Sequence, residues 1–150
     1  LFFYTPPKNN YNVRQIFLGN YIKWDPVKVS NISKRLGFKN NKNPKTGYYN
    51  FADIDDDFIS IHHWLKYYKF GFTRLFDNLS IEIRNKRISR SQALKIIKKS
   101  SFLPPKKDIN KFCNYVNIST KKFFNISEKF RNKDIWKKKN NKWIIEDFIN

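Results

Sequence analysis

The sequence predicts a mainly α-helical fold. Apolar residues recur at intervals of three and four in several segments, and residues that cap helices stand before those segments. Glycine or proline follows or separates the same segments. A short strand at Val13–Leu18, before Gly19, is the one β element expected, although six residues do not distinguish a strand from a loop. The 150 residues fit one compact domain or a part of a larger one.

The first helix is expected to begin after Asp25, whose carboxylate can cap it, with Pro26 at its first position. Gly37 ends it, because glycine readily adopts the left-handed conformation that follows many helices. An exposed loop rich in asparagine, lysine, proline and glycine follows at 39–50, and residues 1–12 are expected to form another loop. Apolar residues recur along this helix at Val29, Ile32 and Leu36.

The second helix carries the densest group of functional side chains and ends at Gly71. An acidic run precedes it, at Asp53, Asp55, Asp56 and Asp57. Carboxylates there can accept hydrogen bonds from free backbone N–H groups, so we interpret the run as helix capping rather than as a metal site. The residues expected to form the buried face of this helix are Phe58, Ile61, Leu65 and Tyr68.

The third helix is expected over Thr73–Lys86. Its inward side chains are Phe72, Leu75, Phe76, Leu79 and Ile83. The fourth helix starts at Ser89, where Ser-x-x-Gln forms a capping box. Its buried residues are Ala93, Leu94 and Ile97.

Two more helices are expected near the end of the sequence. Pro104 and Pro105 break the chain before a helix at Lys106–Tyr115. Ser119 or Thr120 caps the other helix. Its apolar residues are Phe123, Phe124, Ile126 and Phe130. The lysine- and asparagine-rich stretch that follows, between Trp136 and Trp143, is expected to be a solvated turn.

The formal charge of +19 first suggests a polyanionic partner such as nucleic acid. We discount part of it, because the sequence is rich in lysine, asparagine, isoleucine and phenylalanine, the amino acids of A/T-rich codons. No membrane span or signal peptide is evident and Cys113 is the single cysteine, so a soluble, cytoplasmic protein is expected. The lack of methionine and the start at Leu1 indicate a fragment of a longer protein.

Polar residues of two consecutive helices can converge on one anionic ligand. Those of the second helix lie beside its buried face, at i, i+4 and i+7: His62, Lys66 and Lys69. Those of the third helix share one face: Arg74, Asp77 and Arg84. Arginine supplies a two-pronged donor and lysine a point charge. The alternative is a solvated basic face with a weak Arg74–Asp77 surface pair.

Other catalytic patterns are missing from the sequence. It contains no Gly-x-Ser-x-Gly, no Cys-x-x-Cys and no glycine-rich phosphate loop. His62 and His63 are adjacent and point to different sides of a helix, so they do not form a two-histidine metal pair. We therefore predict no metal site.

Three groups of residues carry a resemblance to a known family. They read Gly47-Tyr48-Tyr49-Asn50-Phe51, then His62-x-Trp64-Leu65-Lys66-Tyr67-x-Lys69-Phe70-Gly71-Phe72-x-Arg74-x-x-Asp77, then Glu82-Ile83-Arg84-Asn85-x-Arg87-Ile88-Ser89-Arg90. Over roughly residues 14–147 the sequence resembles the C-terminal portion of the N-acetyl sugar amidotransferases of surface-polysaccharide biosynthesis, such as that of lipopolysaccharide and O-antigen.

The resemblance implies an ATP-pyrophosphatase (PP-loop) enzyme. An N-terminal α/β domain, adenine nucleotide alpha hydrolase-like, binds ATP, with Mg²⁺ expected, through a Ser-Gly-Gly-x-Asp-Ser loop that this sequence lacks. Family members convert an acetamido group of a nucleotide-linked sugar to an acetamidino group, with ammonia from glutaminase and cyclase-like partner proteins. We accordingly expect 1–52 to end the α/β domain, 53–103 to be a central helical motif region and 104–150 a C-terminal helical region. The fragment alone is expected to be inactive.

Carried over residue by residue, the motif ranks Lys69, Arg74 and Asp77 first. The second rank is His62, Lys66, Arg84 and Arg90. Our hypothesis is that Lys69 and Arg74 hold the diphosphate of the sugar nucleotide or the phosphates of ATP, while Asp77 orients Arg74.

Two other functions are compatible with the sequence. One is a basic helical nucleic-acid-binding module, which short capped helices with basic faces would suit. Against it, the basic residues are spread along the whole chain instead of lying on one recognition helix. The other is a docking surface on the C-terminal helices for the ammonia-supplying partner. This function is compatible with the amidotransferase interpretation.

Overall fold

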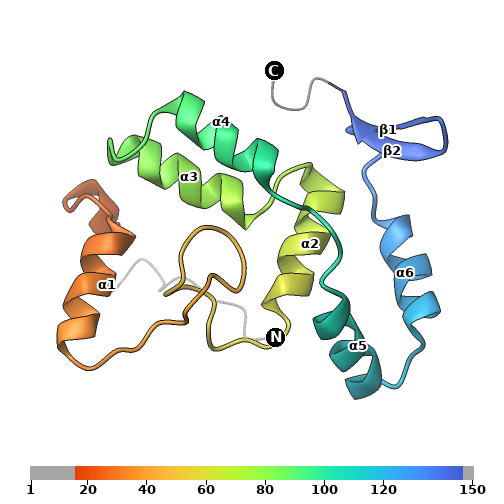
Figure 1. Ribbon diagram of the computed structural model, residues 1–150, viewed down its shortest axis with the longest axis horizontal. Helices are drawn as coiled ribbons and strands as arrows, with labels where there is room; N and C mark the ends of the chain where they lie inside the picture. The colour runs from red at the N-terminus through yellow and green to blue at the C-terminus, as the bar shows by residue number, and fades with distance from the viewer. Residues whose placement is uncertain (1–15, 147–150) are drawn as a thin grey trace, which may run out of the picture.

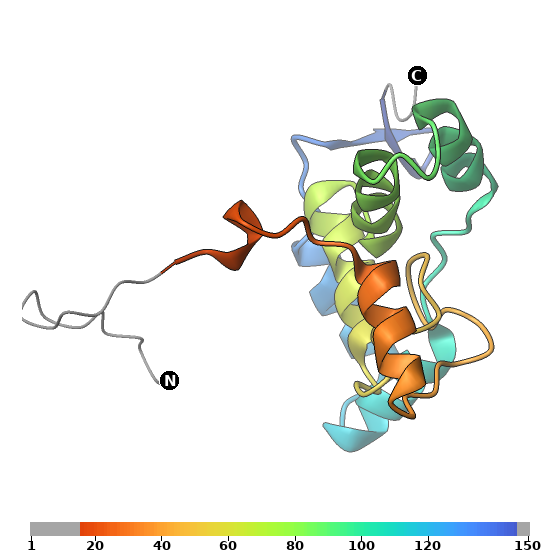
Figure 2. The same ribbon diagram turned by 90° about the vertical axis from the view of Figure 1, so that its left-hand side faces the viewer.

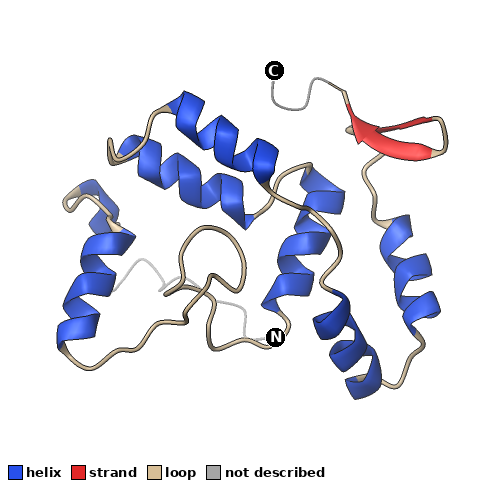
Figure 3. Cartoon of the chain, viewed as in Figure 1, coloured by secondary structure: helices blue, strands red, loops and turns tan. Residues whose placement is uncertain are grey.

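The computed structural model describes residues 16–146 (Figure 1). Its elements, in chain order, are η1 (Leu18–Asn20), α1 (Pro26–Arg35), α2 (Ile59–Phe70), α3 (Arg74–Arg84), α4 (Arg90–Lys99), α5 (Lys106–Tyr115), α6 (Thr120–Lys129), β1 (Trp136–Lys139) and β2 (Lys142–Ile145). Helices dominate, and the strands of the described range form one small hairpin (Figure 3). The mainly α-helical prediction is therefore confirmed. Among these residues, no helix is both long enough and apolar enough to cross a lipid bilayer.

The prediction for the N-terminal part of the chain is right for α1 and wrong for the short strand. Asp25 caps α1 by accepting hydrogen bonds from the backbone N–H groups of Val27 and Lys28, and Gly37 follows the helix with a φ of +97°. The strand at Val13–Leu18 lies partly outside the described residues. It is wrong over residues 16–18, where the chain enters the 3₁₀ turn η1 instead. The expected loop at 1–12 also lies outside the described range.

The acidic run does not cap α2. The N-cap residue is Phe58, whose side chain makes no capping hydrogen bond, and the first turn holds no acidic residue. Asp56 accepts a hydrogen bond from the Phe58 N–H just before the helix begins. Asp53 and Asp57 form ion pairs with basic residues of other segments. The acidic residues therefore hold the loop before α2 against other segments, and they contribute little to the start of the helix.

Two apolar clusters form the core. The first joins α2, α5 and α6 and has as its buried members Ile61, Trp64, Ile109, Cys113 and Phe123. The second lies between α3 and α4, which run side by side in both views (Figures 1 and 2), and has as its buried members Leu75, Leu79, Ala93 and Ile97. The predicted capping box of α4, with Ser89 and Gln92, is present. Most of the predicted inward side chains therefore pack as expected.

The stretch predicted as a solvated turn is a β-hairpin. Asn140 and Asn141 connect β1 and β2 with φ of +47° and +60°, a conformation that asparagine tolerates well. The hairpin is joined to α2, because the Trp136 indole N–H donates to the Tyr68 carbonyl at 2.9 Å. The guanidinium of Arg131 lies 3.9 Å from the Tyr68 ring centroid, and it also lies near the rings of Trp136 and Trp143. The predicted C-terminal region therefore contains strands as well as helices.

A polar network around the buried Glu82 joins three segments that are distant in sequence. The guanidinium of Arg87 donates to both carboxylate oxygens of Glu82 on α3 and to Asp25 at the start of α1. The hydroxyl of Tyr49, in the loop after α1, donates to the same Glu82 carboxylate. The network therefore fixes α1 and the 45–50 loop against α3, and this loop forms part of the candidate site.

Candidate functional site

Gly71 sets the corner between α2 and α3. Its φ of +73° is left-handed, and its N–H donates to the Tyr67 carbonyl as the helix ends. A Cβ at this position would lie 3.1 Å from the side chains of Ile135 and Ile145, so the hairpin region packs closely on the corner. Glycine relieves both constraints, the backbone conformation and the limited space. The polar edges of α2 and α3 consequently face one shared space.

A cavity of about 540 Å³ occupies this space, and we call it the cationic cavity. It is lined by His62, His63, Leu65, Lys66, Lys69, Phe70, Arg74, Asp77 and Phe130. The structure places five of the seven candidate residues around this cavity: His62, Lys66, Lys69, Arg74 and Asp77. Arg84 and Arg90 are exposed and do not line the cavity, so the structure does not bring them to this site.

The ion pairs of the cavity differ from the prediction. Asp77 accepts a hydrogen bond from Lys66, whose Nζ lies 2.5 Å from Oδ2 and 4.3 Å from the centroid of the Phe72 ring. Arg74 pairs with Asp53 of the preceding loop, with 3.6 Å between Nε and Oδ2. The predicted Arg74–Asp77 pair is therefore wrong. Asp77 holds Lys66 across the helix corner, and it does not orient Arg74.

Arg74 is incompletely satisfied in the described structure. Its Nε and the Oδ2 of Asp53 are both buried, and neither atom has a hydrogen-bond partner among the described residues. The side chain as a whole is 39% exposed. The ion pair with Asp53 is thus not closed by a hydrogen bond, and the guanidinium has further N–H donors from which an anion could accept.

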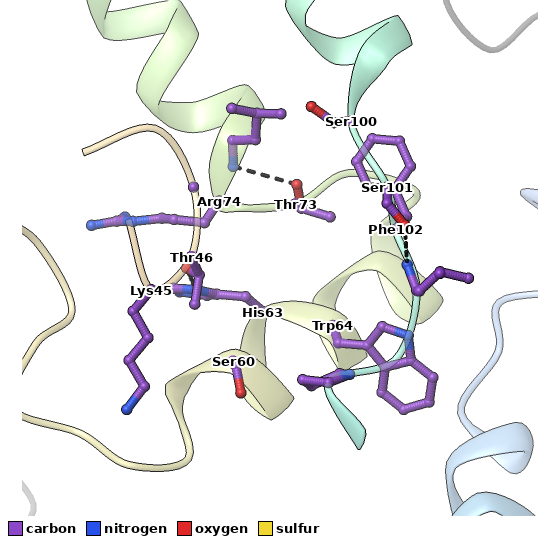
Figure 4. A pocket seen from close by; sticks show the side chains of 14 residues that line it. Lys45, Thr46, Ser60, His63, Trp64, Thr73, Arg74, Ser100, Ser101 and Phe102 are labelled. Atoms are coloured by element: carbon purple, nitrogen blue, oxygen red, sulfur yellow. Dashed lines mark hydrogen bonds between the residues drawn. The ribbon is translucent and has the colours of Figure 1, made fainter. Parts of the chain in front are cut away.

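A second cavity, of about 340 Å³, shares His63 and Arg74 with the first, and we call it the hydroxyl cavity (Figure 4). Five hydroxyl side chains line it: Thr46, Ser60, Thr73, Ser100 and Ser101. In Figure 4, Thr46 and His63 lie together on one side, and Ser100 and Ser101 face them from the α4–α5 connection. The two cavities therefore meet at a common wall.

His63 is the buried residue of this common wall. Its Nδ1 lies 2.5 Å from the hydroxyl oxygen of Thr46, which fixes the orientation of the ring. Burial lowers the pKa of His63, and the nearby charges of Arg74, His62 and Lys66 lower it further, while Asp53 partly opposes them. The imidazole is consequently neutral at neutral pH.

The loop that carries Thr46 is held on α3 by Asn78. The Tyr48 N–H donates to the buried Asn78 Oδ1 at 3.0 Å. At Gly47, a Cβ would lie 2.3 Å from the same oxygen, and the φ of +71° also favours glycine. Sequence reasoning missed Thr46, His63 and Asn78 as site residues. The available signal was the Gly47-Tyr48-Tyr49 motif, whose glycine marks this close approach.

The electrostatics of the cationic cavity suit an anion. Lys66, Lys69 and Arg74 contribute three positive charges, whereas Asp77 is the one carboxylate among the described residues that line the cavity. Arginine and lysine together provide directed and point-charge contacts for phosphate oxygens. Among residues 16–146, no group of three or more histidine, cysteine, aspartate or glutamate side chains is placed to hold a metal ion.

Comparison with protein families gives a match over most of the chain. A model of the family described as "LPS biosynthesis protein WbpG-like, C-terminal domain" matches residues 45–148. This range is more than half of the 150 residues. The matched range includes both cavities and begins after α1. A search of curated proteins gave no match. The chain therefore belongs to the family of C-terminal domains of WbpG-like lipopolysaccharide biosynthesis proteins.

Proposed function

We propose that this domain is the substrate-binding part of an ATP-dependent amidotransferase. The enzyme converts an acetamido group of a nucleotide-linked sugar to an acetamidino group, and the cationic cavity binds the diphosphate of that substrate. The observation that carries the proposal is the convergence of Lys66 and Lys69 on α2 with Arg74 on α3. Membership of a lipopolysaccharide biosynthesis family supports a sugar substrate.

The reaction requires activation, because an amide oxygen is a poor leaving group. ATP transfers its adenylyl group to this oxygen and releases pyrophosphate. Ammonia then attacks the amide carbon, the C–O bond breaks, and AMP leaves with the oxygen. ATP, with Mg²⁺, is bound mainly by an α/β part outside this sequence, and ammonia comes from glutaminase and cyclase-like partners. The role of this domain is to hold the sugar nucleotide where the two steps occur.

Within the cationic cavity, Lys69 and Arg74 are the residues proposed to contact the diphosphate. Lys66 is already paired with Asp77, which reduces its attraction for a second anion. Lys69 has no carboxylate partner among the described residues, and its Nζ lies 5.7 Å from the Phe70 ring centroid. Arg74 faces Asp53 at 3.6 Å, but its Nε makes no hydrogen bond in that range. Lys69, and to a smaller extent Arg74, therefore gain more from an anionic ligand than Lys66, which is hydrogen-bonded to Asp77.

The direct test is an assay of the full-length enzyme with UDP-linked N-acetyl sugars, ATP and ammonium. Mass spectrometry should detect a product in which NH replaces oxygen, formed together with AMP and only when ATP and ammonium are both present. Lys69→Ala and Arg74→Ala should abolish its formation. Wild-type turnover by either variant would contradict the assigned roles, and no product from any N-acetyl sugar nucleotide would contradict the reaction.

The nucleic-acid alternative has its own test. A nucleic-acid-binding module should bind a random duplex tightly at about 50 mM salt and lose most of that affinity at about 200 mM. We expect only weak, nonspecific binding, because the site described above is a cavity and not an exposed recognition helix. Tight binding with a steep salt slope would favour the alternative.

A further inference from the structure

The hydroxyl cavity has a wall chemistry different from that of the cationic cavity. Two of its hydroxyls already donate their proton: Ser60 to the Asp108 carboxylate and Ser100 to the Ile96 carbonyl. Each keeps lone pairs that can accept a hydrogen bond. The wall therefore offers acceptors to a ligand.

Two other hydroxyls of the same wall accept hydrogen bonds from the protein backbone. Thr73 accepts from the Leu75 N–H at 3.3 Å, and Ser101 accepts from the Leu103 N–H at 3.4 Å. Each keeps its own proton to donate. The hydroxyl cavity thus presents both donors and acceptors, which matches a ligand whose hydroxyl groups also do both.

The aromatic residues of the hydroxyl cavity argue against a nucleobase. Trp64 is only 6% exposed and packs at 4.4 Å on Tyr68, while Phe102 stacks on Tyr67 at 4.8 Å. A base needs a free aromatic face to stack on, and a ring that is already packed offers little of one. A sugar needs only hydroxyl partners and apolar surface for its C–H groups. The mixed wall therefore suits a sugar better.

The cavities are joined through His63 and Arg74, which line both. We infer that they form one bipartite site, in which the cationic cavity binds a phosphate group and the hydroxyl cavity binds the sugar that carries it. This inference rests on the proposed function and specifies which cavity takes which part of the substrate. Both volumes, about 340 and 540 Å³, fall within the usual range of ligand pockets, roughly 300 to 1,000 Å³.

The test uses NMR titrations of the 150-residue chain with four probes: inorganic phosphate, N-acetylglucosamine, N-acetylglucosamine 1-phosphate and uridine 5′-monophosphate. Phosphate should shift signals of Lys69 and Arg74 only. The sugar phosphate should shift these and also Ser101 and Thr73, and it should bind more tightly than phosphate or sugar alone. Uridine monophosphate should shift only the residues of the cationic cavity.

A matched pair of serine substitutions provides the second measurement. Ser101 is exposed and belongs to the hydroxyl cavity, whereas Ser80 is exposed on α3 and lines neither cavity. Loss of one hydrogen bond in Ser101→Ala should weaken sugar phosphate binding about three- to tenfold and leave phosphate binding unchanged. Ser80→Ala should change neither.

The outcomes separate the two proposals. If sugar phosphate shifts only the cationic cavity and Ser101→Ala binds it normally, the sugar subsite is wrong while the anion site stands. If uridine monophosphate shifts Ser101 and Thr73 as strongly as the sugar phosphate does, the subsite is not selective for sugar and the inference is overturned. If no phosphate compound shifts Lys69 or Arg74, the anion site of the proposed function is also wrong.

Discussion

Lys66 of α2 donates a hydrogen bond to Asp77 of α3, and this ion pair spans the helix corner at Gly71. The pair lies in the wall of the cationic cavity and is partly exposed, at 22% for the lysine and 33% for the aspartate side chain. Lys66 and Arg74 therefore each have a carboxylate partner within the protein, Asp77 and Asp53, whereas Lys69 has none among the described residues.

Removal of the Asp77 charge should strengthen anion binding. In Asp77→Asn, Lys66 no longer has its carboxylate partner and its charge adds to those of Lys69 and Arg74. We expect affinity for inorganic phosphate to rise about two- to fivefold at low salt, because the pair is partly solvated. Titration calorimetry measures the change. Weaker phosphate binding would mean that Asp77 positions the site in a way the ion pair does not explain.

Substitution of Arg87 should destabilise the fold. Arg87→Ala leaves the Glu82 carboxylate, whose side chain is only 5% exposed, without its guanidinium partner. The Arg87 hydrogen bonds lower the pKa of Glu82, which shows that they favour its charged form. We expect a loss of about 3 kcal/mol, the low end for a broken buried pair, because Arg87 is 30% exposed.

Urea unfolding of Arg87→Ala measures this loss. The control is Arg90→Ala, which removes the same charge from an exposed residue and should change the free energy of unfolding by less than about 0.5 kcal/mol. Equal losses in the two variants would show that net charge, and not the Glu82 network, accounts for the effect.

Substitution of Arg131 should destabilise the packing of the hairpin on α2. Its guanidinium donates to both Glu128 oxygens, at 2.8 and 2.9 Å, and lies near three aromatic rings. Arg131→Lys keeps the charge but loses the planar two-pronged geometry. We expect a loss of about 1 to 2 kcal/mol for lysine and about 3 for alanine, seen as a lower Tm. A Tm unchanged in Arg131→Ala would show that the hairpin docks without this contact.

Stability should depend on pH through His63. The folded state lowers its pKa from 6.5, so below about pH 6.5 the unfolded chain binds a proton that the folded chain does not. The free energy of unfolding should therefore fall as pH drops from 7.5 towards the folded pKa. Losses from Glu82 and Glu128, whose pKa values are lowered by arginine partners, should follow below about pH 4.5.

Urea unfolding across this pH range tests the assignment to His63. His63→Gln should flatten the slope between pH 7.5 and 5, although the variant is less stable throughout. His62→Gln, at the exposed neighbour, should keep most of the slope. The same slope in wild type and His63→Gln would contradict the assignment.

The sequence predicted the helices well because their signals are local. Asp25, Ser89 and Gly71 cap or end helices where the pattern indicated. The hairpin was missed because the lysines of β1 are exposed on consecutive positions, so no apolar alternation marks a strand.

The site was predicted less completely because its contacts join distant segments. Helical spacing brought Arg74 and Asp77 onto one face, yet each found a partner elsewhere, at Asp53 and Lys66. The hydrogen bond between Thr46 and His63 spans 17 residues, and no local pattern encodes it. Local periodicity therefore predicts on which edge of a helix a side chain lies. Its ion-pair and hydrogen-bond partners depend on tertiary packing.

The central claim is that the cationic cavity, and not the diffuse charge of +19, binds the phosphates of the substrate. The most direct measurement is the affinity of the 150-residue chain for UDP-N-acetylglucosamine at about 0.15 M salt, where distant surface charges are screened. Lys69→Ala should weaken binding about tenfold or more, as expected for loss of a charge-assisted contact. Arg84→Ala and Lys95→Ala remove the same charge outside the cavity and should bind like wild type. Equal losses in all three variants would contradict the account.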